Sequence, residues 1–278
     1  MWRIIRTRFQ QGHRTMAYPD GPPPPLPARF RGRPVIDPTR CEAGCRLCAE
    51  ACPTDAISIQ ALETDAALEG TAPIPAGRIS VDLGRCLFCT DCVEACPSGA
   101  ITHDVDHRLA SNDRLALHID PTAAIEVAKA MLDEKMRKLF GRSLKLRQVS
   151  AGGCNGCEAD TNVLGTVGWD IGRFGIQFVA SPRHADGLFI TGPVTENMRL
   201  ALQKTWDAVP TPKIVIATGA CAISGGPYIG HPEAHDGVAS VVPVDLFIPG
   251  CPPHPLTILD GLLRMLGRIE ADPRRRPR

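Results

Sequence analysis

Twelve cysteines constrain this chain more than any other feature, because most of them stand in two short and similarly spaced runs. The two runs are Cys41, Cys45, Cys48, Cys52 and Cys86, Cys89, Cys92, Cys96. A proline follows the last cysteine of each run. The second run has the spacing C-x2-C-x2-C-x3-C-P, with which bacterial proteins bind cubane iron–sulfur clusters through thiolates. The pattern therefore predicts two [4Fe–4S] clusters in this region.

The sequence around the two runs repeats as well. Residues 51–58 (ACPTDAIS) are echoed by residues 95–102 (ACPSGAIT), which predicts two similar half-units packed together. In such runs the cysteine before the proline binds the other cluster. We therefore expect the first cluster on Cys41, Cys45, Cys48 and Cys96. We expect the second cluster on Cys86, Cys89, Cys92 and Cys52.

The first run departs from this spacing at one position, because three residues instead of two separate Cys41 from Cys45. Either the loop bulges at Gly44, or the first cluster is distorted or incomplete. We favour the bulge, since glycine tolerates unusual dihedral angles and no other cysteine is spare. Two structural zinc sites are the alternative for both runs, although zinc does not require this spacing.

From residue 144 onward, short apolar runs alternate with helical patterns, which predicts a parallel sheet covered by helices on both faces. The expected strands are 144–149, 176–180, 187–191, 213–218 and a part of 241–248. The expected helices are 157–167, 196–208 and 255–267. The predicted fold class is α/β: an N-terminal α+β two-cluster domain, followed by a small flavodoxin-like doubly wound sheet.

The third group of cysteines belongs to this second part of the chain. Its members are Cys154, Cys157, Cys221 and Cys251. They are far apart in sequence, but each follows a predicted strand, and the loops beyond the carboxyl ends of parallel strands converge on one crevice. The topology thus predicts that four thiolates meet and bind a third [4Fe–4S] cluster. A zinc site with the same ligands is the alternative, because scattered cysteines have no spacing code.

The pattern divides the chain into five segments. They are an N-terminal segment (1–34), the two-cluster domain (35–119), a linker helix (120–141), the sheet domain (142–270) and a basic tail (271–278). Within the first segment, residues 2–9 form either a short amphipathic helix on a membrane or partner surface, or a frayed basic end. Residues 20–27 are proline-rich, which predicts an extended tether. Residues 60–78 are polar and predict a surface insertion.

Composition excludes several classes of protein. Lys and Arg number 31 against 30 for Asp and Glu, so no overall field points to nucleic acid. Cys-x-x-Cys clusters predict a reducing compartment, and we expect no secretory signal. The sequence has no run of about 18 apolar residues, so we expect no transmembrane segment. It also has no glycine-rich dinucleotide or P-loop motif.

These motifs resemble a known pairing of proteins. Residues 141–267 are similar to the small, cluster-bearing subunit of membrane-bound energy-converting [NiFe] hydrogenases of the formate hydrogenlyase type, and to the related 20 kDa subunit of complex I. The matching stretches are 141–144 (GRSL), 151–158 (AGGCNGCE), 181–186 (SPRHAD), 191–198 (TGPVTENM) and 249–253 (PGCPP). The first part, including 30–34 (FRGRP), resembles the two-cluster ferredoxin subunit of the same complexes. Their fusion in one chain is unusual.

The resemblance implies an electron-transfer subunit of an oxidoreductase complex that is not catalytic alone. Three [4Fe–4S] clusters would pass electrons to or from a large catalytic subunit, which holds a [NiFe] centre or a quinone site. Two residues separate Cys154 from Cys157, as in the hydrogenase branch, whereas complex I subunits have adjacent cysteines there. This favours a hydrogenase over a complex I-like quinone oxidoreductase. A zinc-stabilised interaction protein is the alternative from another class.

The family also implies membrane subunits as partners, no nucleic acid, and a peripheral position on the cytoplasmic side of the inner membrane. Residues 2–9 are a candidate contact with the membrane surface, if they form the amphipathic helix rather than a frayed end. Glu158 is a candidate for proton transfer beside the third cluster. A glutamate in the first turn of a helix is also simply favourable with the helix dipole, so both interpretations stand.

Overall fold

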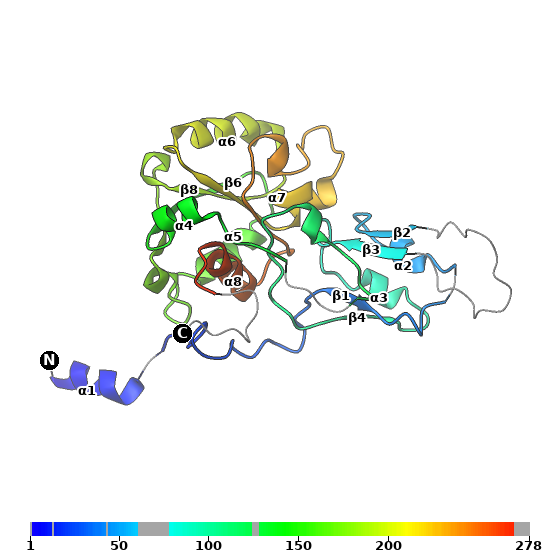
Figure 1. The fold of residues 1–278 in the computed structure, drawn as a ribbon, viewed down its shortest axis with the longest axis horizontal. Coiled ribbons are helices and arrows are strands. Elements are labelled where there is room, and N and C mark those ends of the chain that lie inside the picture. The colour runs from blue at the N-terminus through cyan, green and yellow to red at the C-terminus, as the bar shows by residue number, and fades with distance from the viewer. Residues whose placement is uncertain (1, 13, 43, 61–77, 124–127, 270–278) are drawn as a thin grey trace.

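The computed structural model describes residues 2–12, 14–42, 44–60, 78–123 and 128–269. These residues form two adjoining modules, and the N-terminal helix α1 (Trp2–Gln11) projects away from both (Figure 1). The predicted insertion and basic tail fall largely on 61–77 and 270–278, which lie outside the described residues. Among the described residues, no helix is long and apolar enough to cross a membrane.

The first module is built from short antiparallel strands and two one-turn helices that repeat along the chain. Its elements are β1 (Pro34–Ile36), α2 (Leu47–Glu50), β2 (Ile57–Gln60), β3 (Arg78–Asp82), α3 (Asp91–Glu94), β4 (Ile101–His103), the 3-10 helix η1 (Leu115–Leu117) and β5 (His118–Ile119). Strand β1 pairs with β4, and β2, β3 and β5 form a second sheet. Helices α2 and α3 occupy equivalent places in the two half-units, as the internal repeat predicted.

The second module is a five-stranded parallel sheet with the order β10-β9-β8-β6-β7. Its strands are β6 (Leu144–Ser150), β7 (Ile176–Phe178), β8 (Gly187–Thr191), β9 (Ile214–Thr218) and β10 (Leu246–Ile248). Its helices are α5 (Gly156–Val163), α6 (Glu196–Ala208), α7 (Ala220–Ser224) and α8 (Pro255–Met265), with short 3-10 helices at Ile171–Phe174, Pro182–His184, Gly226–Tyr228 and Val238–Ser240. This is the flavodoxin-like strand order, which confirms the predicted fold class.

Side chains of the central strand β8 alternate between the two faces of the sheet. Leu188 and Ile190 belong to the apolar cluster that includes Leu202 of α6, whereas Phe189 belongs to the cluster on the opposite face with α8. Every residue of β8 is buried, as expected for a strand covered on both sides. Helix α8 is itself buried along its whole length. The sheet lies on one side of it, and the N-terminal chain that leads into the first module lies on another.

The two modules share a continuous boundary. At the edge of the sheet, Ser111 and Phe247 exchange two backbone hydrogen bonds of 3.0 and 2.8 Å, so the chain leaving the first module extends the sheet beside β10. On the other side, the hydroxyl of Ser224 in α7 donates to the carbonyl of Gly84 at 2.9 Å. One apolar cluster runs from β3 into the α6 face of the sheet.

The predicted linker helix over 120–141 is wrong for most of its described residues. Helix α4 covers only Glu134–Phe140, with the Asp133 side chain accepting a hydrogen bond from the N–H of Met136 as its cap. Residues 124–127 lie outside the described residues. The residues just before α4 form backbone hydrogen bonds with other segments instead of with each other. For example, the carbonyl of Lys129 accepts a hydrogen bond from the N–H of Asn112. Contacts with neighbouring segments thus replace the helical bonds that the amphipathic pattern favoured.

Candidate metal centres

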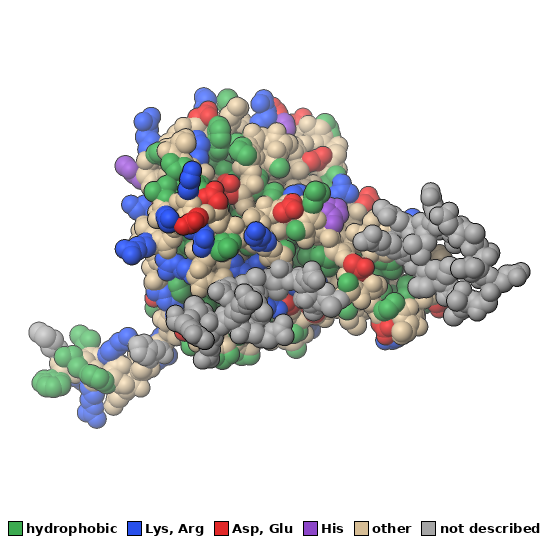
Figure 2. Space-filling view, viewed as in Figure 1, with side chains coloured by type: hydrophobic (Ala, Val, Ile, Leu, Met, Phe, Trp, Pro, Cys, Tyr) green, Lys and Arg blue, Asp and Glu red, His purple; other side chains and the backbone are tan. Residues whose placement is uncertain are grey.

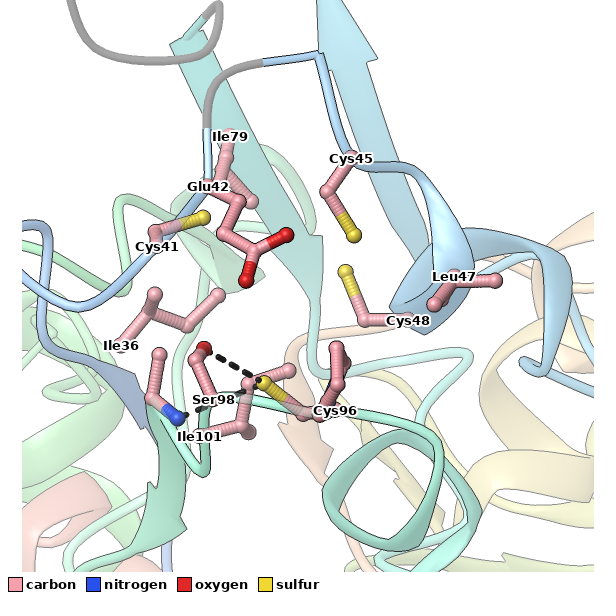
Figure 3. A pocket seen from close by; sticks show the side chains of 12 residues that line it. Ile36, Cys41, Glu42, Cys45, Leu47, Cys48, Ile79, Cys96, Ser98 and Ile101 are labelled. Carbon is pink, nitrogen blue, oxygen red and sulfur yellow. Dashed lines mark hydrogen bonds between the residues drawn. The ribbon is translucent and has the colours of Figure 1, made fainter.

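The cysteines predicted to bind the first cluster line one small pocket of the first module (Figure 3). They are Cys41, Cys45, Cys48 and Cys96. Apolar side chains from β1, β3 and β4 also line it, together with Glu42, Leu47, Pro97, Ser98 and Ala100. Cys96 comes from the second run, after α3, so the fold brings it across to the three cysteines of the first run. Its sulfur accepts a hydrogen bond from the N–H of Ala100 at 3.3 Å and lies 3.5 Å from the Ser98 hydroxyl.

The irregular spacing of the first run does not remove Cys41 from this pocket. Gly44 adopts a left-handed conformation with φ of 77°, and the space beside its Cα is open. This is the conformation that a bulge at Gly44 requires, and glycine adopts it without steric cost.

The cysteines predicted to bind the second cluster also lie together. Burial, together with the neighbouring sulfurs of Cys92, Cys52 and Cys89, raises the pKa of Cys86 to about 12. Cys52 reaches this group from the first run, which mirrors the crossing of Cys96. Its sulfur accepts a hydrogen bond from the N–H of Ala56 at 3.2 Å, the counterpart of the bond from Ala100.

The first and second groups of cysteines are neighbours. Burial raises the pKa of Cys92 in α3 to about 11, and Cys89, Cys52 and also Cys48 of α2 contribute to the increase. Helix α2 packs directly against α3. The two groups of sulfurs therefore approach each other where α2 meets α3.

The third group gathers at the carboxyl edge of the parallel sheet, as the topology predicted. Cys154 and Cys157 follow β6, Cys221 opens α7 after β9, and Cys251 follows β10. Burial, together with the sulfurs of Cys251 and Cys154, raises the pKa of Cys221 to about 11. Burial likewise raises the pKa of Cys157, with contributions from the other three cysteines. Cys154 and Cys251 are exposed, so this group opens to the surface.

Glycine is required where the backbone passes these sulfurs. A Cβ at Gly219, where φ is 90°, would lie 2.5 Å from the sulfur of Cys157. A Cβ at Gly226 would lie 2.9 Å from the sulfur of Cys221. The glycines thus keep the space beside the sulfurs clear, so that one bound group can contact several of them. In the first module, backbone N–H groups also point at sulfurs. Both observations fit iron–sulfur clusters.

The third group also approaches the first module. Burial raises the pKa of Cys251, and the sulfurs of Cys154 and of Cys89 add to the shift. Cys89 belongs to the second group. The three groups therefore follow one another in space, with Cys48 and Cys92 at one junction and Cys89 and Cys251 at the other.

Glu158 lies beside Cys157 at the start of α5 and points into the protein. Its side chain is buried and accepts a hydrogen bond of 2.5 Å from the Thr191 hydroxyl at the end of β8. This contact ties α5 to the sheet directly beneath the third group.

Over the described part of the chain, no three His, Cys, Asp or Glu side chains are close enough to hold a single metal ion.

Some residues at these sites were missed by the sequence analysis. Thr54 and Ser98 place hydroxyls 3.9 and 3.5 Å from the sulfurs of Cys52 and Cys96. The signal was present, because both occupy the second position after the repeated cysteine, but the repeat alone did not show that they face sulfur.

Fold and sites together define an iron–sulfur protein with a two-cluster ferredoxin part and a flavodoxin-like part. Family models agree with this division. Residues 40–100 match the "4Fe-4S dicluster domain", and residues 154–265 match the "NADH ubiquinone oxidoreductase, 20 Kd subunit". The chain belongs to the family of this 20 kDa subunit and its membrane-bound hydrogenase relatives, fused to a dicluster ferredoxin domain.

Individual relatives cover about half of the chain. A probable membrane-bound hydrogenase subunit of Pyrococcus furiosus is 41% identical over 48% of this chain and 79% of its own length. Formate hydrogenlyase subunit 7 of Escherichia coli is 41% identical over 52% of this chain and 57% of its own length. An NADH-quinone oxidoreductase subunit of Clostridium beijerinckii is 42% identical over 41% of this chain and 68% of its own length. All three are subunits of oxidoreductases, which confirms the predicted class.

Proposed function

We propose that this chain is the electron-transfer subunit of a membrane-associated, energy-converting [NiFe] hydrogenase of the formate hydrogenlyase type. It passes electrons through three [4Fe–4S] clusters to or from a large catalytic subunit and does not turn over substrate alone. The observation that supports this most is the series of three cysteine groups, which runs from the first module to the exposed Cys154 and Cys251. The names of the hydrogenase relatives support the same assignment.

The proposed ligands follow the groups that the fold brings together. The first cluster is held by Cys41, Cys45, Cys48 and Cys96, the second by Cys52, Cys86, Cys89 and Cys92, and the third by Cys154, Cys157, Cys221 and Cys251. The proposed domains are 35–119 and 142–270, joined by 120–141 and flanked by 1–34 and 271–278. When bound, each cluster supplies one-electron redox chemistry. The chain supplies thiolates, hydrogen bonds to sulfur and burial from water.

Buried thiols are poor ligands until a positively charged group replaces their protons. Burial raises the pKa of Cys86 to about 12 and that of Cys92 and Cys221 to about 11, so these thiols are protonated in the metal-free chain at neutral pH. Cluster insertion therefore releases protons.

The exposed rim of the third group is the proposed contact with the large catalytic subunit. Cys154 and Cys251 are exposed there, so the third cluster lies at the surface in the absence of a partner. Electrons would pass at this rim to the [NiFe] centre of the large subunit. Glu158 is a proposed proton-transfer residue near it. Its burial against Thr191 also supports a purely structural role.

Helix α1 is the proposed contact with the membrane surface, on the cytoplasmic side of the inner membrane and beside the membrane subunits of the complex. No residue of α1 is buried, and Trp2 and Phe9 are 82% and 83% exposed. Hydrophobic and basic side chains both lie on the surface of this projecting helix (Figure 2). Apolar side chains interleaved with basic ones suit an anionic lipid interface. The double variant Trp2→Ala/Phe9→Ala should bind anionic vesicles more weakly in sedimentation. Unchanged binding would contradict this contact.

A complex I-like quinone oxidoreductase is the second candidate. It is favoured by the match to the 20 kDa subunit and by the similarity to a quinone oxidoreductase subunit. The two candidates differ in the partner: a hydrogenase complex purified through this chain should contain nickel and reduce viologen with hydrogen. A nickel-free complex that reduces quinone instead would move the assignment to the second candidate.

Anaerobic purification of the chain tests the proposed function itself. We expect a brown protein with about 12 irons, from three four-iron clusters, that bleaches with dithionite. A colourless, zinc-rich protein would favour the zinc-stabilised interaction protein instead. Mössbauer spectra that show fewer than two clusters would also overturn the proposal.

A further inference from the structure

Residues 14–33, here termed the N-terminal strap, cross from the second module to the first. At one end, the Tyr18 hydroxyl donates a hydrogen bond of 2.9 Å to Asp260 in the buried helix α8. At the other end, the N–H of Gly32 donates to the carbonyl of Asp104 at 2.9 Å. A Cβ at Gly32 would lie 2.0 Å from the Asp104 carboxylate, so the strap fits closely there. Both modules therefore fix the strap in place.

Arg31, the residue before this tight fit, contacts the loop of the second cysteine run. Its guanidinium donates a hydrogen bond of 2.6 Å to the carbonyl of Phe88. Phe88 stands between Cys86 and Cys89 in a left-handed conformation with φ of 53°, and its N–H donates to the sulfur of Cys86 at 3.3 Å. The positive charge is thus attached to the peptide that joins Phe88 to Cys89.

This contact lies where the second and third cysteine groups face each other. Arg31, Phe88 and Cys251 line the same cavity, whose volume is about 340 Å³. Cys251 belongs to the third group and is close enough to Cys89 for the two sulfurs to affect one another. The strap therefore delivers a cation to the junction between the modules.

We propose that Arg31 is a positioning residue for the electron step between the second and third clusters, and that it favours the reduced form of the second. This inference rests on the proposed function. A reduced cluster carries one more negative charge than an oxidised one, so a nearby cation stabilises it. The bond to Phe88 also polarises the peptide and strengthens the Cys89 N–H as a donor.

Arg31 is exposed, so solvent and salt screen part of its charge. Screening does not remove the hydrogen bond to Phe88. A neighbouring arginine separates the two contributions: Arg29 lines the same cavity and is exposed as well, but has no hydrogen bond among the described residues. Neutralising Arg29 removes the same charge without touching the cysteine loop.

The test is a redox titration of the full chain, followed by paramagnetic resonance, for Arg31→Gln, Arg31→Lys and Arg29→Gln. For Arg31→Gln, we expect the oxidised form of one cluster to gain about tenfold, a fall of about 59 mV for a one-electron couple. Arg31→Lys should give a smaller fall, because the charge remains and the planar donor is lost. Arg29→Gln should give the smallest. A Cys89→Ser protein identifies the signal of the second cluster.

Two results would overturn the role of Arg31. One is an unchanged midpoint in Arg31→Gln, and the other is an equal fall in Arg29→Gln, which would show only a general effect of surface charge. Iron analysis of the unsubstituted chain keeps this test separate from the proposed function. A protein without clusters would contradict the proposed function, whereas three clusters with unmoved midpoints would contradict Arg31 alone.

Discussion

The two modules position their sulfurs in different ways. In the first, three cysteines of each group come from a stretch of a dozen residues or fewer, around the one-turn helices α2 and α3. In the second, the four cysteines come from three loops at the ends of β6, β9 and β10. The first and last of them are almost a hundred residues apart. The first arrangement depends on local spacing. The second exists only once the sheet has formed.

This difference determines what each site tolerates. A local loop keeps three ligands together even when it gains a residue, as the extra residue before Cys45 illustrates. A site assembled from strand ends depends on the register of every strand and on close approach at glycines such as Gly219. The third site should therefore be the more fragile one.

The substitution Gly219→Ala should give the largest effect on this comparison. The added Cβ meets the sulfur of Cys157 at 2.5 Å and φ of 90° is unfavourable for alanine, so the third cluster should be lost. Iron content should fall from about 12 to about 8 per chain, with the two clusters of the first module retained. Gly168→Ala is the control, because the space beside Gly168 is open. Equal iron in both variants would show that the site is not fragile.

The crossed ligands test how local the first module really is. Cys96→Ser should abolish the cluster that Cys45 and Cys48 bind, although Cys96 lies in the other run. Cys52→Ser should abolish the other cluster. Paramagnetic resonance of the reduced proteins distinguishes the two losses. If Cys96→Ser removed the same signal as Cys86→Ser, each run would bind its own cluster and the crossing would be wrong.

The boundary between the modules depends on a buried ion pair in α8. Asp260 and Arg264 are 1% and 3% exposed and lie 2.7 Å apart. Asp260→Ala leaves the guanidinium buried without its carboxylate, which should cost about 3–5 kcal/mol. The thermal midpoint of the cluster-loaded protein measures this loss of stability. The exposed pair of Glu134 and Lys138 is the control, and Glu134→Ala should cost about 0.5 kcal/mol or less. Similar costs would contradict this role.

The smallest expected effect is on how the stability of the protein depends on pH. His107 lies at the same boundary, edge-on to Tyr18, and burial lowers its pKa below the usual 6.5, against the raising effect of Asp260 and Asp106. Because the unfolded chain binds a proton at higher pH than the folded one, stability should be lost as pH falls from about 6.5 towards the lowered pKa. His107→Gln should flatten this dependence in thermal midpoints measured across pH. The exposed His231 is the control, and His231→Gln should leave the slope unchanged.

Much of the fold was predictable, because its signals are local. The strand over 187–191 and the helix over 196–208 were predicted residue for residue, since continuous apolar runs and amphipathic periodicity stand between clear breakers. Two errors lie at element ends, where a glycine or a proline stands inside the predicted range. The helix expected to run to 167 ends at Val163, two residues before Gly165. The strand expected within 241–248 is limited to Leu246–Ile248, after Pro243.

The candidate sites also have a part that the sequence predicts and a part that it does not. The grouping of the first two sets of sulfurs follows from spacing, and that of the third from strand order. The junctions did not follow from the sequence: Tyr18 and Asp260 are 242 residues apart, and Arg31 and Phe88 are 57 apart. No periodicity links such positions, because side chains of three segments meet there only after both modules have folded.

The strap has a consequence for the order in which the protein is made. Tyr18 leaves the ribosome long before its partner Asp260, which follows it by 242 residues. The N-terminal module folds first during synthesis, since domains generally fold as they emerge. The Tyr18 end of the strap therefore stays without its α8 partner until that helix has been translated, and this contact joins the modules only after the first has formed.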